Sequence, residues 1–321
     1  MKWLGKNVLL TGATGLLGGH FAKRLVSDGA NVVALVRDGV PNCIFYQDGL
    51  DKAATVVRGQ LEDYCLIERV LNEYEIEACF HLGAQTIVGT ANRSPLSTFE
   101  ANIKGTWNVL EAARNSTLLK ALVVASTDKA YGEGSLPYKE TDRLAANHHY
   151  DASKACAEMI CSSYFHSYGM PIGVTRCGNI FGEGDLNFNR IIPGAIRSVL
   201  MKEPLLIRSD GKMVRDYIYV QDVVEANMLL AEFLLRGEQK GEVFNFSLEQ
   251  PQSVLEVVGR VLRMMKSDLK PSILNSAQNE IQSQYLSAEK AHRNLGWKPK
   301  WDFDSGLART IAWYKKYLRY Q

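Results

Sequence analysis

The sequence of 321 residues predicts an α/β protein with a doubly wound parallel sheet and a smaller second α/β domain. Two observations predict the sheet: short apolar, β-branched runs recur through the first half, and amphipathic stretches separate them. Strands that are apolar throughout belong to parallel sheets covered on both faces, and right-handed crossovers then produce the doubly wound order. A third observation predicts the second domain, because the sequence becomes rich in glycine and asparagine after about residue 178.

Short apolar runs in the first half define the expected strands. They lie at residues 7–10, 31–36, 54–57, 78–82 and 121–126. Between the first two, the stretch 16–29 has helical spacing and ends at Gly29, the usual residue type after a last helical turn. A second helix is expected over 97–116, because apolar residues recur there at helical spacing. Those residues are Phe99, Ile103, Trp107 and Leu110.

The sequence after residue 178 predicts shorter strands mixed with helices. The stretch 220–235 has the pattern of a helix, 242–247 that of a strand, and 306–318 that of an amphipathic closing helix. Neither a repeat nor a flexible linker separates the two halves. We therefore expect the second part to pack directly on the first, with a cleft between them.

Composition excludes several classes of protein. A formal net charge of +2 without a basic block provides no electrostatic footprint for nucleic acid. No apolar run reaches the roughly 20 residues that span a bilayer, and glycine and lysine interrupt the start of the chain before a signal peptide forms. The six cysteines lack CxxC spacing, so we expect no metal site, no disulfide framework and reduced thiols in the cytoplasm.

The segment TGATGLLGG places Gly12, Gly15 and Gly18 directly after the first expected strand and at the start of the first helix. Gly12 permits a tight turn, Gly15 lets the backbone approach a pyrophosphate, and Gly18 lets helix and strand pack closely. The start of the helix then offers amide donors and the positive end of its dipole to phosphates. A purely structural turn is the alternative, but the position at the first strand–helix junction favours dinucleotide binding.

This motif assigns a role to each half of the chain. Residues 1–177 are expected to form a Rossmann-type dinucleotide-binding domain, and part of 214–236 is expected to complete it. Residues 178–321 are expected to form the smaller C-terminal α/β domain, which binds the substrate.

The end of the second strand bears on the choice between NAD and NADP. An acidic residue usually holds the adenosine ribose there, but this strand ends with Val36, Arg37 and Asp38. Arg37 suits a 2′-phosphate or stacking on adenine, and Asp38 suits the ribose hydroxyls. We expect NAD, and NADP stays open on these residues.

Tyr150 and Lys154 lie four residues apart in a helical pattern and therefore share one helix face. A tyrosine acts as a base near neutral pH only when its phenolate is stabilised, and an ammonium group one turn away does this. The same lysine reaches the ribose of the nicotinamide. The alternative is an exposed helix face with a chance pair, and the glycine motif upstream weighs against it.

Taken in order, the motifs resemble the extended short-chain dehydrogenase/reductase family of nucleotide-sugar epimerases and dehydratases. The resemblance rests on GxxGxxG, HLGAQ, STDKAYG, Tyr-x-x-x-Lys and the closing NLGWKP…GLARTIAWY, and it covers essentially the whole chain. It implies a retained nicotinamide cofactor, a nucleotide-sugar substrate and a homodimer formed through helices like 97–114 and 151–167. The residues that it assigns to the cofactor are Gly12, Thr14, Gly15, Leu16, Leu17, Gly18, Arg37, Leu82, Ala84, Tyr150 and Lys154.

Four further residues are predicted to bind the substrate. The resemblance assigns Gln85 to the substrate and places Asn179 near the sugar diphosphate, although a turn-forming asparagine is an equal alternative. Arg190 and Arg215 are candidate diphosphate or nucleotide contacts, because guanidinium forks suit phosphate oxygens. His81, in an apolar run, is expected to be a hydrogen-bonded core histidine and not a ligand.

The strand end VVASTDKAYG carries Thr127, Asp128 and Lys129. In the resembled family, epimerases typically lack an acid–base pair here and 4,6-dehydratases have one. The resemblance therefore implies that Thr127 holds the sugar 4-hydroxyl, Asp128 is the acid at C6 and Lys129 is the base at C5. Successive strand residues face opposite ways, so Asp128 and Lys129 converge only if the strand has already ended. The alternative is that Asp128 caps a turn or helix while Lys129 lies in solvent.

The sequence thus predicts an NAD-retaining nucleotide-sugar 4,6-dehydratase. Asp-Lys pairs occur in the CDP-glucose and the inverting UDP-N-acetylglucosamine enzymes of the resembled family, and the stretches 175–198 and 207–223 resemble the CDP-glucose branch most. CDP-glucose is therefore the leading substrate. A 4-epimerase or an N-acetylhexosamine dehydratase with the same Tyr/Lys pair is the nearest alternative. A regulatory protein that senses NAD(P) is the alternative from another class, and such proteins commonly lack that pair.

Overall fold

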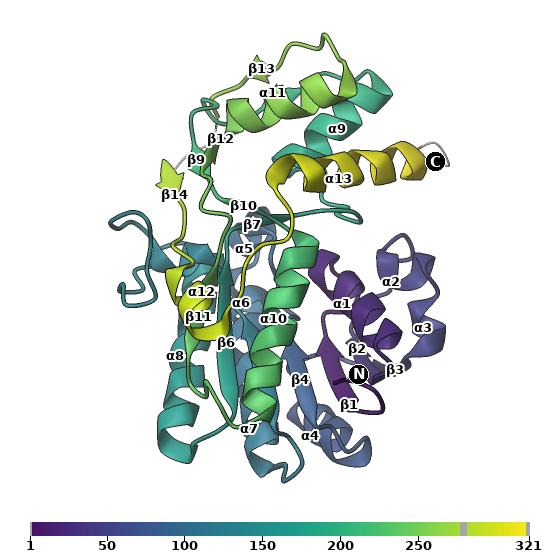
Figure 1. Cartoon of the computed structure of the whole chain (residues 1–321), viewed down its shortest axis with the longest axis vertical. Coiled ribbons are helices and arrows are strands. Elements are labelled where there is room, and N and C mark those ends of the chain that lie inside the picture. The colour runs from purple at the N-terminus through teal and green to yellow at the C-terminus, as the bar shows by residue number, and fades with distance from the viewer. Residues whose placement is uncertain (1, 277–280, 319–321) are drawn as a thin grey trace.

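The computed structural model describes residues 2–276 and 281–318 and has a central sheet of seven parallel strands (Figure 1). In spatial order the strands are β11 (Val243–Phe246), β6 (Ile172–Cys177), β5 (Ala121–Ala125), β4 (Ala78–His81), β1 (Asn7–Thr11), β2 (Asn31–Val36) and β3 (Thr55–Arg58). The chain runs outward from β1 to β3 on one side and from β4 to β11 on the other. The predicted doubly wound parallel sheet is therefore confirmed.

The strands alternate their side chains between two hydrophobic layers, as the pleat requires. In β1, Val8 and Leu10 face one layer and Leu9 faces the other. The first layer lies under α1 (Leu16–Ser27), α10 (Val220–Leu235) and α12 (Glu289–Leu295). The second lies under α4 (Tyr64–Glu73), α7 (Gly105–Asn115) and α8 (His149–Tyr168). Both faces of the sheet are covered, which explains why its strands are apolar throughout.

The helix expected over 97–116 is divided in the structure. It consists of α6 (Pro95–Phe99), a π-helical turn η1 (Glu100–Lys104) and α7, and α5 (Val88–Arg93) precedes it. A π-turn widens the helix by one residue and is often found at functional sites. Apolar spacing alone does not reveal it, because the residues on both sides keep a helical pattern.

The strand β11 corrects part of the predicted division of the chain. Its residues were assigned to the second half, beyond both residue 177 and the segment 214–236, but it pairs with β6 in the central sheet. Phe244 and Phe246 are fully buried in the core layer under α12, so this run needs the cover that the central layers provide. The helix α10, which falls within 214–236, packs on β5 and β6 between α1 and α12 (Figure 1). The boundary at residue 177 otherwise remains a prediction.

The short helices α2 (Ile44–Gln47) and α3 (Leu50–Ala53) pack beside α1, and most elements after β6 other than α10, β11 and α12 form a second body above the sheet in Figure 1. Its helices are α9 (Ile191–Met201), α11 (Val254–Met265) and α13 (Phe303–Tyr317). Its short strands pair as β7 (Asn179–Phe181) with β10 (Tyr217–Tyr219), β8 (Leu206–Ile207) with β13 (Ser272–Ile273), and β9 (Val214–Arg215) with β12 (Gln252–Ser253) and β14 (Ser283–Gln284). A third hydrophobic cluster holds these helices together, with Ile196, Val257 and Leu307 at its centre.

Candidate active site

The turn between β1 and α1 has the geometry of a phosphate site. Gly12 has φ +78°, and a Cβ on it would lie 2.8 Å from the backbone nitrogen of Gly83. A Cβ on Gly18 would lie 2.0 Å from the carbonyl oxygen of Gly12. The helix begins at Leu16, and no side chain of the described residues caps it at Gly15. Its first amide groups are therefore left for an anion, and the turn fits a pyrophosphate.

The loop after β4 lies against this glycine turn. Strands β1 and β4 are the neighbours at which the strand order reverses, and ligands of doubly wound sheets bind at such a point. Leu82 and Leu17 are partly buried against the same core layer, and Leu16 packs on the cluster of the second body. The predicted cofactor residues Thr14, Leu16, Leu17, Leu82 and Ala84 thus all belong to the two loops at this switch point or to the first turn of α1.

A buried histidine at the end of β4 connects these loops by hydrogen bonds. His81 Nδ1 lies 3.0 Å from Thr11 Oγ1, its Nε2 lies 3.1 Å from Thr106 Oγ1, and Gly83 N donates to Thr11 Oγ1 at 2.9 Å. Burial, followed by the charge of Lys154, lowers the pKa of His81 to about 3. His81 is therefore a neutral, hydrogen-bonded core residue, as predicted.

Asn102 is a site residue that the sequence analysis missed. It lies on η1, and its Oδ1 accepts from Gln85 N at 2.7 Å while its Nδ2 donates to Gln85 O at 3.0 Å and to Ser153 Oγ at 2.9 Å. Gln85 Oε1 in turn accepts from Ile87 N at 3.0 Å. The π-turn thus connects the loop after β4 to the helix of Tyr150. A buried amide inside an apolar helical pattern was the available signal.

Arg37 and Asp38 occupy the exposed end of β2. Arg37 Nε pairs with Asp38 Oδ2 at 2.6 Å, and both side chains are more than half exposed. The acid and the guanidinium considered for the adenosine ribose therefore lie side by side.

Tyr150 and Lys154 lie on α8 and face inward. They are 8% and 5% exposed, so an exposed face with a chance pair is excluded. Lys154 Nζ donates to Ala125 O at the end of β5. Burial lowers the pKa of Lys154 to about 8, and Glu158 opposes this shift. Burial, followed by the charges of Asp128 and Asp151, raises the pKa of Tyr150 to about 12, and a hydrogen bond with Thr127 opposes the rise.

The strand that leads to Thr127 ends at Ala125, and a 3₁₀ turn η2 (Asp128–Tyr131) follows. Thr127 is the cap of this turn, because its Oγ1 accepts from Lys129 N at 3.3 Å and donates to Asp128 Oδ1 at 3.0 Å. Since the strand has ended, the alternation of side chains no longer separates Asp128 from Lys129. The Lys129 ammonium lies 3.6 Å from Asp128 Oδ1.

The surroundings of this pair contradict the alternative of a capping aspartate and a solvated lysine. Asp128 is 1% exposed, and its Oδ2 has no hydrogen-bond partner among the described residues. The Lys129 side chain is 24% exposed, and its Nζ lies 3.4 Å from Asn179 Oδ1. Asn179 therefore faces Asp128 and Lys129 from β7.

Asp151 is a second residue that the sequence analysis missed. It follows Tyr150 in the first turn of α8, is 6% exposed, and its Oδ1 has no hydrogen-bond partner in the described part of the chain. Burial raises the pKa of Asp151 to about 6, while the charges of Lys129 and His148 act against that rise. It adds a second buried carboxyl group to the surroundings of Tyr150.

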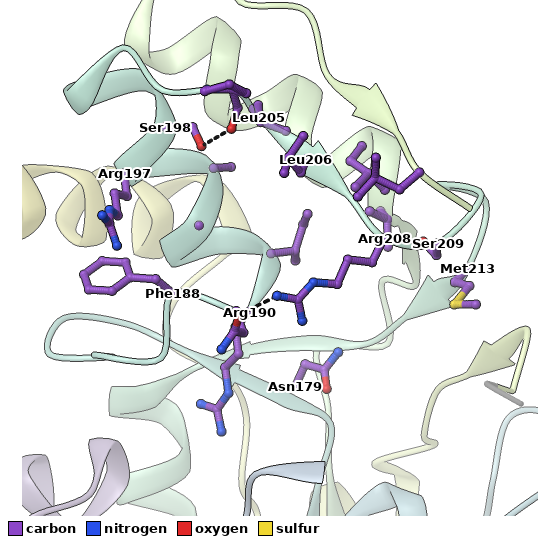
Figure 2. A pocket seen from close by; sticks show the side chains of 18 of the residues that line it. Asn179, Phe188, Arg190, Arg197, Ser198, Leu205, Leu206, Arg208, Ser209 and Met213 are labelled. Atoms are coloured by element: carbon purple, nitrogen blue, oxygen red, sulfur yellow. Dashed lines mark hydrogen bonds between the residues drawn. The ribbon is translucent and has the colours of Figure 1, made fainter. Parts of the chain in front are cut away.

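A cavity of about 470 Å³ opens in the second body next to this cluster (Figure 2). Its walls come from α9, β8 and β9 and include the predicted residues Asn179, Arg190 and Arg215. Arg190 pairs with Asp185 at 3.1 Å, and the buried Arg215 donates to the backbone oxygen of Val214 at 2.9 Å. Asn179 belongs both to the cavity and to the surroundings of Lys129, so the two sites are continuous.

The cavity also contains residues that were not predicted. Phe188 provides an aromatic face, and Arg208, which directly follows β8, donates to Asn189 Oδ1 at 2.5 Å. Figure 2 shows Arg190, Arg208 and Asn179 at the same end of the cavity. Arginine clusters suit diphosphates, and an aromatic face suits a base or a sugar. The sequence around Phe188 and Arg208 shows no motif that would distinguish these two residues from ordinary surface residues.

Comparison with known proteins identifies the class. The model of the NAD dependent epimerase/dehydratase family matches residues 8–246, so the chain belongs to this family of nucleotide-binding α/β proteins. A dTDP-glucose 4,6-dehydratase of Xanthomonas campestris pv. campestris is 30% identical over 95% of this chain and 92% of its own length. A CDP-glucose 4,6-dehydratase of Salmonella typhimurium is 28% identical over 99% of this chain and 92% of its own length.

Longer relatives share the same region. A trifunctional UDP-glucose 4,6-dehydratase, 3,5-epimerase and reductase of Arabidopsis thaliana is 29% identical over 96% of this chain. The chain spans 47% of that protein's length.

Solved structures agree in fold. A UDP-glucose 4-epimerase of Thermotoga maritima, solved with UDP-glucose, has a TM-score of 0.89 at 27% identity and covers 97% of this chain and 99% of its own. A dTDP-glucose 4,6-dehydratase of Streptomyces venezuelae, solved with NAD, has a TM-score of 0.87 at 26% identity and covers 97% of both chains. Dehydratases and epimerases thus share this architecture.

In the ranges 2–276 and 281–318, no helix is long and apolar enough to cross a membrane. Within the same ranges, histidine, cysteine and carboxylate side chains do not gather in a group of three that would hold a metal ion.

Proposed function

We propose that this protein is a nucleotide-sugar 4,6-dehydratase that retains NAD and converts a nucleoside-diphosphate hexose to its 4-keto-6-deoxy derivative. CDP-glucose is the leading substrate, because 175–198 and 207–223 resemble the CDP-glucose branch and a CDP-glucose 4,6-dehydratase aligns with 99% of the chain. dTDP- and UDP-glucose are the competing substrates, since relatives named for them are equally similar.

One observation carries the proposal: a buried acid and a lysine follow the strand end beside Tyr150. Removing water across C5 and C6 of a hexose needs a base at C5 and an acid at the C6 hydroxyl. Asp128 and Lys129 are an acid and a potential base 3.6 Å apart, and Thr127 connects them to Tyr150. An epimerase only oxidises and reduces C4 and has no use for this pair.

In the proposed cycle three side chains transfer protons and a fourth, Thr127, orients the 4-hydroxyl. Tyr150, once its phenol is ionised, takes the proton of the 4-hydroxyl, which Thr127 orients through its own hydroxyl. The glycine turn after β1 and Lys154 would hold the nicotinamide dinucleotide, which would supply the acceptor for hydride from C4 and the donor of hydride to C6. The 4-keto group acidifies C5–H, so Lys129, once neutral, removes that proton while Asp128 protonates the departing C6 hydroxyl. Lys129 then returns its proton to C5, and the proton that Tyr150 took from the 4-hydroxyl passes to Asp128 through the Thr127 hydroxyl, which restores both groups for the next turnover.

Asn179, Arg190 and Arg215 are proposed to bind the nucleotide side of the substrate. Their shared cavity supports this, since guanidinium groups from α9 and β9 lie where a diphosphate would leave the sugar at Asn179. Gln85 is proposed to contact the sugar from the loop after β4, which Asn102 holds in place.

The alternatives predict different products. A 4-epimerase is favoured by the neighbouring solved epimerase, and an N-acetylhexosamine dehydratase is favoured by the same Asp-Lys pair. A regulatory protein that senses NAD(P) has no need of the buried Tyr150 and Lys154.

Mass spectrometry of the products separates these functions. Purified protein is incubated with CDP-glucose, dTDP-glucose, UDP-glucose and UDP-N-acetylglucosamine. We expect loss of the mass of one water, fastest with CDP-glucose. An unchanged mass with altered C4 configuration would identify an epimerase, and no turnover of any substrate would reject the enzyme proposal. Analysis of small molecules released by denaturation identifies the retained dinucleotide, which we expect to be NAD.

We further propose a homodimer and a cytoplasmic location. Leu96, Trp107 and Met159 are large apolar side chains exposed on α6, α7 and α8, the helices predicted to pair. The cytoplasmic location is proposed from the six cysteines, whose spacing in the sequence suits reduced thiols. Light scattering of the purified protein checks the dimer, and Trp107→Lys should shift it to monomer.

A further inference from the structure

A buried ion pair lies behind the proposed active site. Arg176 on β6 donates to Glu158 on α8 through Nε at 2.9 Å and through Nη2 at 2.5 Å, both to Oε2. The two side chains are each 5% exposed. Taking two charges out of water is costly, and apolar replacements of such pairs are often as stable or more so. Stability alone therefore does not explain why Arg176 and Glu158 are buried as an ion pair.

The ion pair holds both ends of the catalytic turn. Ser126 Oγ, directly before Thr127, donates to Glu158 Oε1. Arg176 Nη1 donates to the hydroxyl of Tyr131, the last residue of η2, at 2.6 Å, and its guanidinium lies 4.5 Å from the centre of that ring. Tyr131 in turn donates to Asn245 on β11 at 2.8 Å. The segment 127–130, with the acid and the base, is thus tied at each end to one ion pair.

The same pair is connected to the helix of the proposed base. Glu158 lies one turn after Lys154, which lies one turn after Tyr150, and all three face inward. Lys154 Nζ also donates to Ala125 O, just before Ser126. Helix α8 and the strand end of β5 are therefore joined at two successive turns, by Lys154 and by Glu158.

We propose that Glu158 and Arg176 are positioning residues that hold Asp128 and Lys129 in register with Tyr150. This inference rests on the proposed function, because it concerns the alignment of the same proton-transferring groups. A planar guanidinium fork and a carboxylate fix distance and angle, whereas apolar packing of equal volume does not. A misplacement of about 1 Å is enough to cost about 100-fold in rate.

Glu158 has a second effect, on the charge of Lys154. Three titratable groups face Lys154 directly: His81 from β4, and Glu158 and Cys161 from its own helix. Two more act through Glu158: Arg176 from β6, which pairs with it, and Tyr131 from η2, which is bonded to Arg176. Glu158 is the group that favours the ammonium form most. Removing its charge lowers the pKa of Lys154 further below about 8. Activity that needs the ammonium form is then lost at a lower pH than in the wild type.

The test uses a charge-neutral double variant, Glu158→Gln with Arg176→Met, which leaves no unpaired buried charge. Arg176→Lys is the conservative variant, since it keeps the charge and loses the fork. Asp222→Asn is the matched control: Asp222 is buried, accepts from Lys300 N at 2.8 Å and Trp301 N at 3.1 Å, and lies on α10 away from the site. Each variant is assayed for turnover, nucleotide affinity and amide exchange.

For the double variant we expect kcat to fall about 100-fold, as a misaligned catalytic group predicts. KM and the affinity for CDP should stay near the wild-type values, because the cavity residues do not touch the pair. The alkaline limb of the kcat profile should move to lower pH. Arg176→Lys should lie between the double variant and the wild type, and Asp222→Asn should lose stability with an unchanged pH profile. Wild-type kcat and pH profile in a folded double variant would overturn the proposal.

Amide hydrogen exchange keeps this result separate from the proposed function. In the double variant, peptides that cover 126–132 should exchange faster than in the wild type, and Asp222→Asn should not change them. If the wild type turns over no nucleotide sugar, the proposed function fails and this measurement alone decides the positioning role. Unchanged exchange at 126–132, or equal acceleration in Asp222→Asn, would reject it.

Discussion

The turn after β1 and the strand end after β5 lie on either side of β4, but they are built from different groups. The first consists of backbone: glycines at positions where a Cβ would collide, and helix amides without a side-chain cap. The second consists of side chains, with Asp128, Lys129, Tyr150 and Lys154 from two elements and an ion pair behind them. Backbone geometry suits a ligand common to a whole family, and side chains determine which reaction follows.

Replacing Tyr150, the proposed base for the 4-hydroxyl, should lower kcat more than any other change at the strand end after β5. Tyr150→Phe removes the only group proposed to take the 4-hydroxyl proton, and we expect kcat to fall by about 10⁴-fold. Folding and dinucleotide retention should persist, because the phenol ring is kept. Steady-state kinetics with circular dichroism check both, and turnover near the wild-type rate would exclude Tyr150 as the base.

Replacing Lys129 should interrupt the reaction one step later. With Lys129→Met we expect product formation to fall by about 10³-fold, the loss typical of a missing general base. In heavy water, the variant should no longer incorporate deuterium at C5, while oxidation at C4 persists. Nuclear magnetic resonance of the recovered sugar measures this incorporation. Undiminished product would show that Lys129 is not the base at C5. The strand end after β5 would then owe less of its chemistry to side chains than we propose.

The same difference explains what could be predicted from the sequence. The glycine turn was predicted in place, because its constraint is local: spacing, a preceding strand and a following helix. Asp128 and Lys129 were predicted as site residues, but the sequence does not show that their side chains lie close together. They do so because β5 ends at Ala125 and a 3₁₀ turn starts at Asp128, and no residue pattern predicts either boundary.

The residues that were missed depend on contacts far apart in the chain. Asn102 matters because it bonds to Gln85 and Ser153, and Arg208 because β8 brings it beside Asn189. β11 belongs to the central sheet because Phe244 and Phe246 are buried there in the layer that α12, far along the chain, covers. Long-range packing of this kind leaves no mark on a single sequence.

A glycine replacement tests the turn after β1, whose proposed ligand contacts come from the backbone. Gly12→Ala places a Cβ 2.8 Å from Gly83 N at a left-handed φ of +78°, and we expect about 1–3 kcal/mol of destabilisation with loss of the bound dinucleotide. The matched control is Gly259→Ala, in helix α11 with nothing within 4 Å of its Cβ, which should gain about 0.4–1 kcal/mol. Urea unfolding and mass spectrometry of released small molecules measure both. Retention of the dinucleotide by Gly12→Ala would contradict a backbone-built site.

The smallest expected effect concerns the carboxyl group next to Tyr150. Burial raises the pKa of Asp151 to about 6, so the folded state binds its proton more tightly than the unfolded state. Its burial therefore costs nothing below a pH of about 4, costs more as the pH rises, and reaches its full cost above about 6. Asp151→Asn removes this charge, and we expect a gain of up to about 2 kcal/mol at pH 8 that disappears near pH 4. Urea unfolding across this range measures the difference. A gain independent of pH would mean that the Asp151 carboxyl group has the same pKa in the folded and unfolded protein, and burial beside Tyr150 would then impose no cost on its charge.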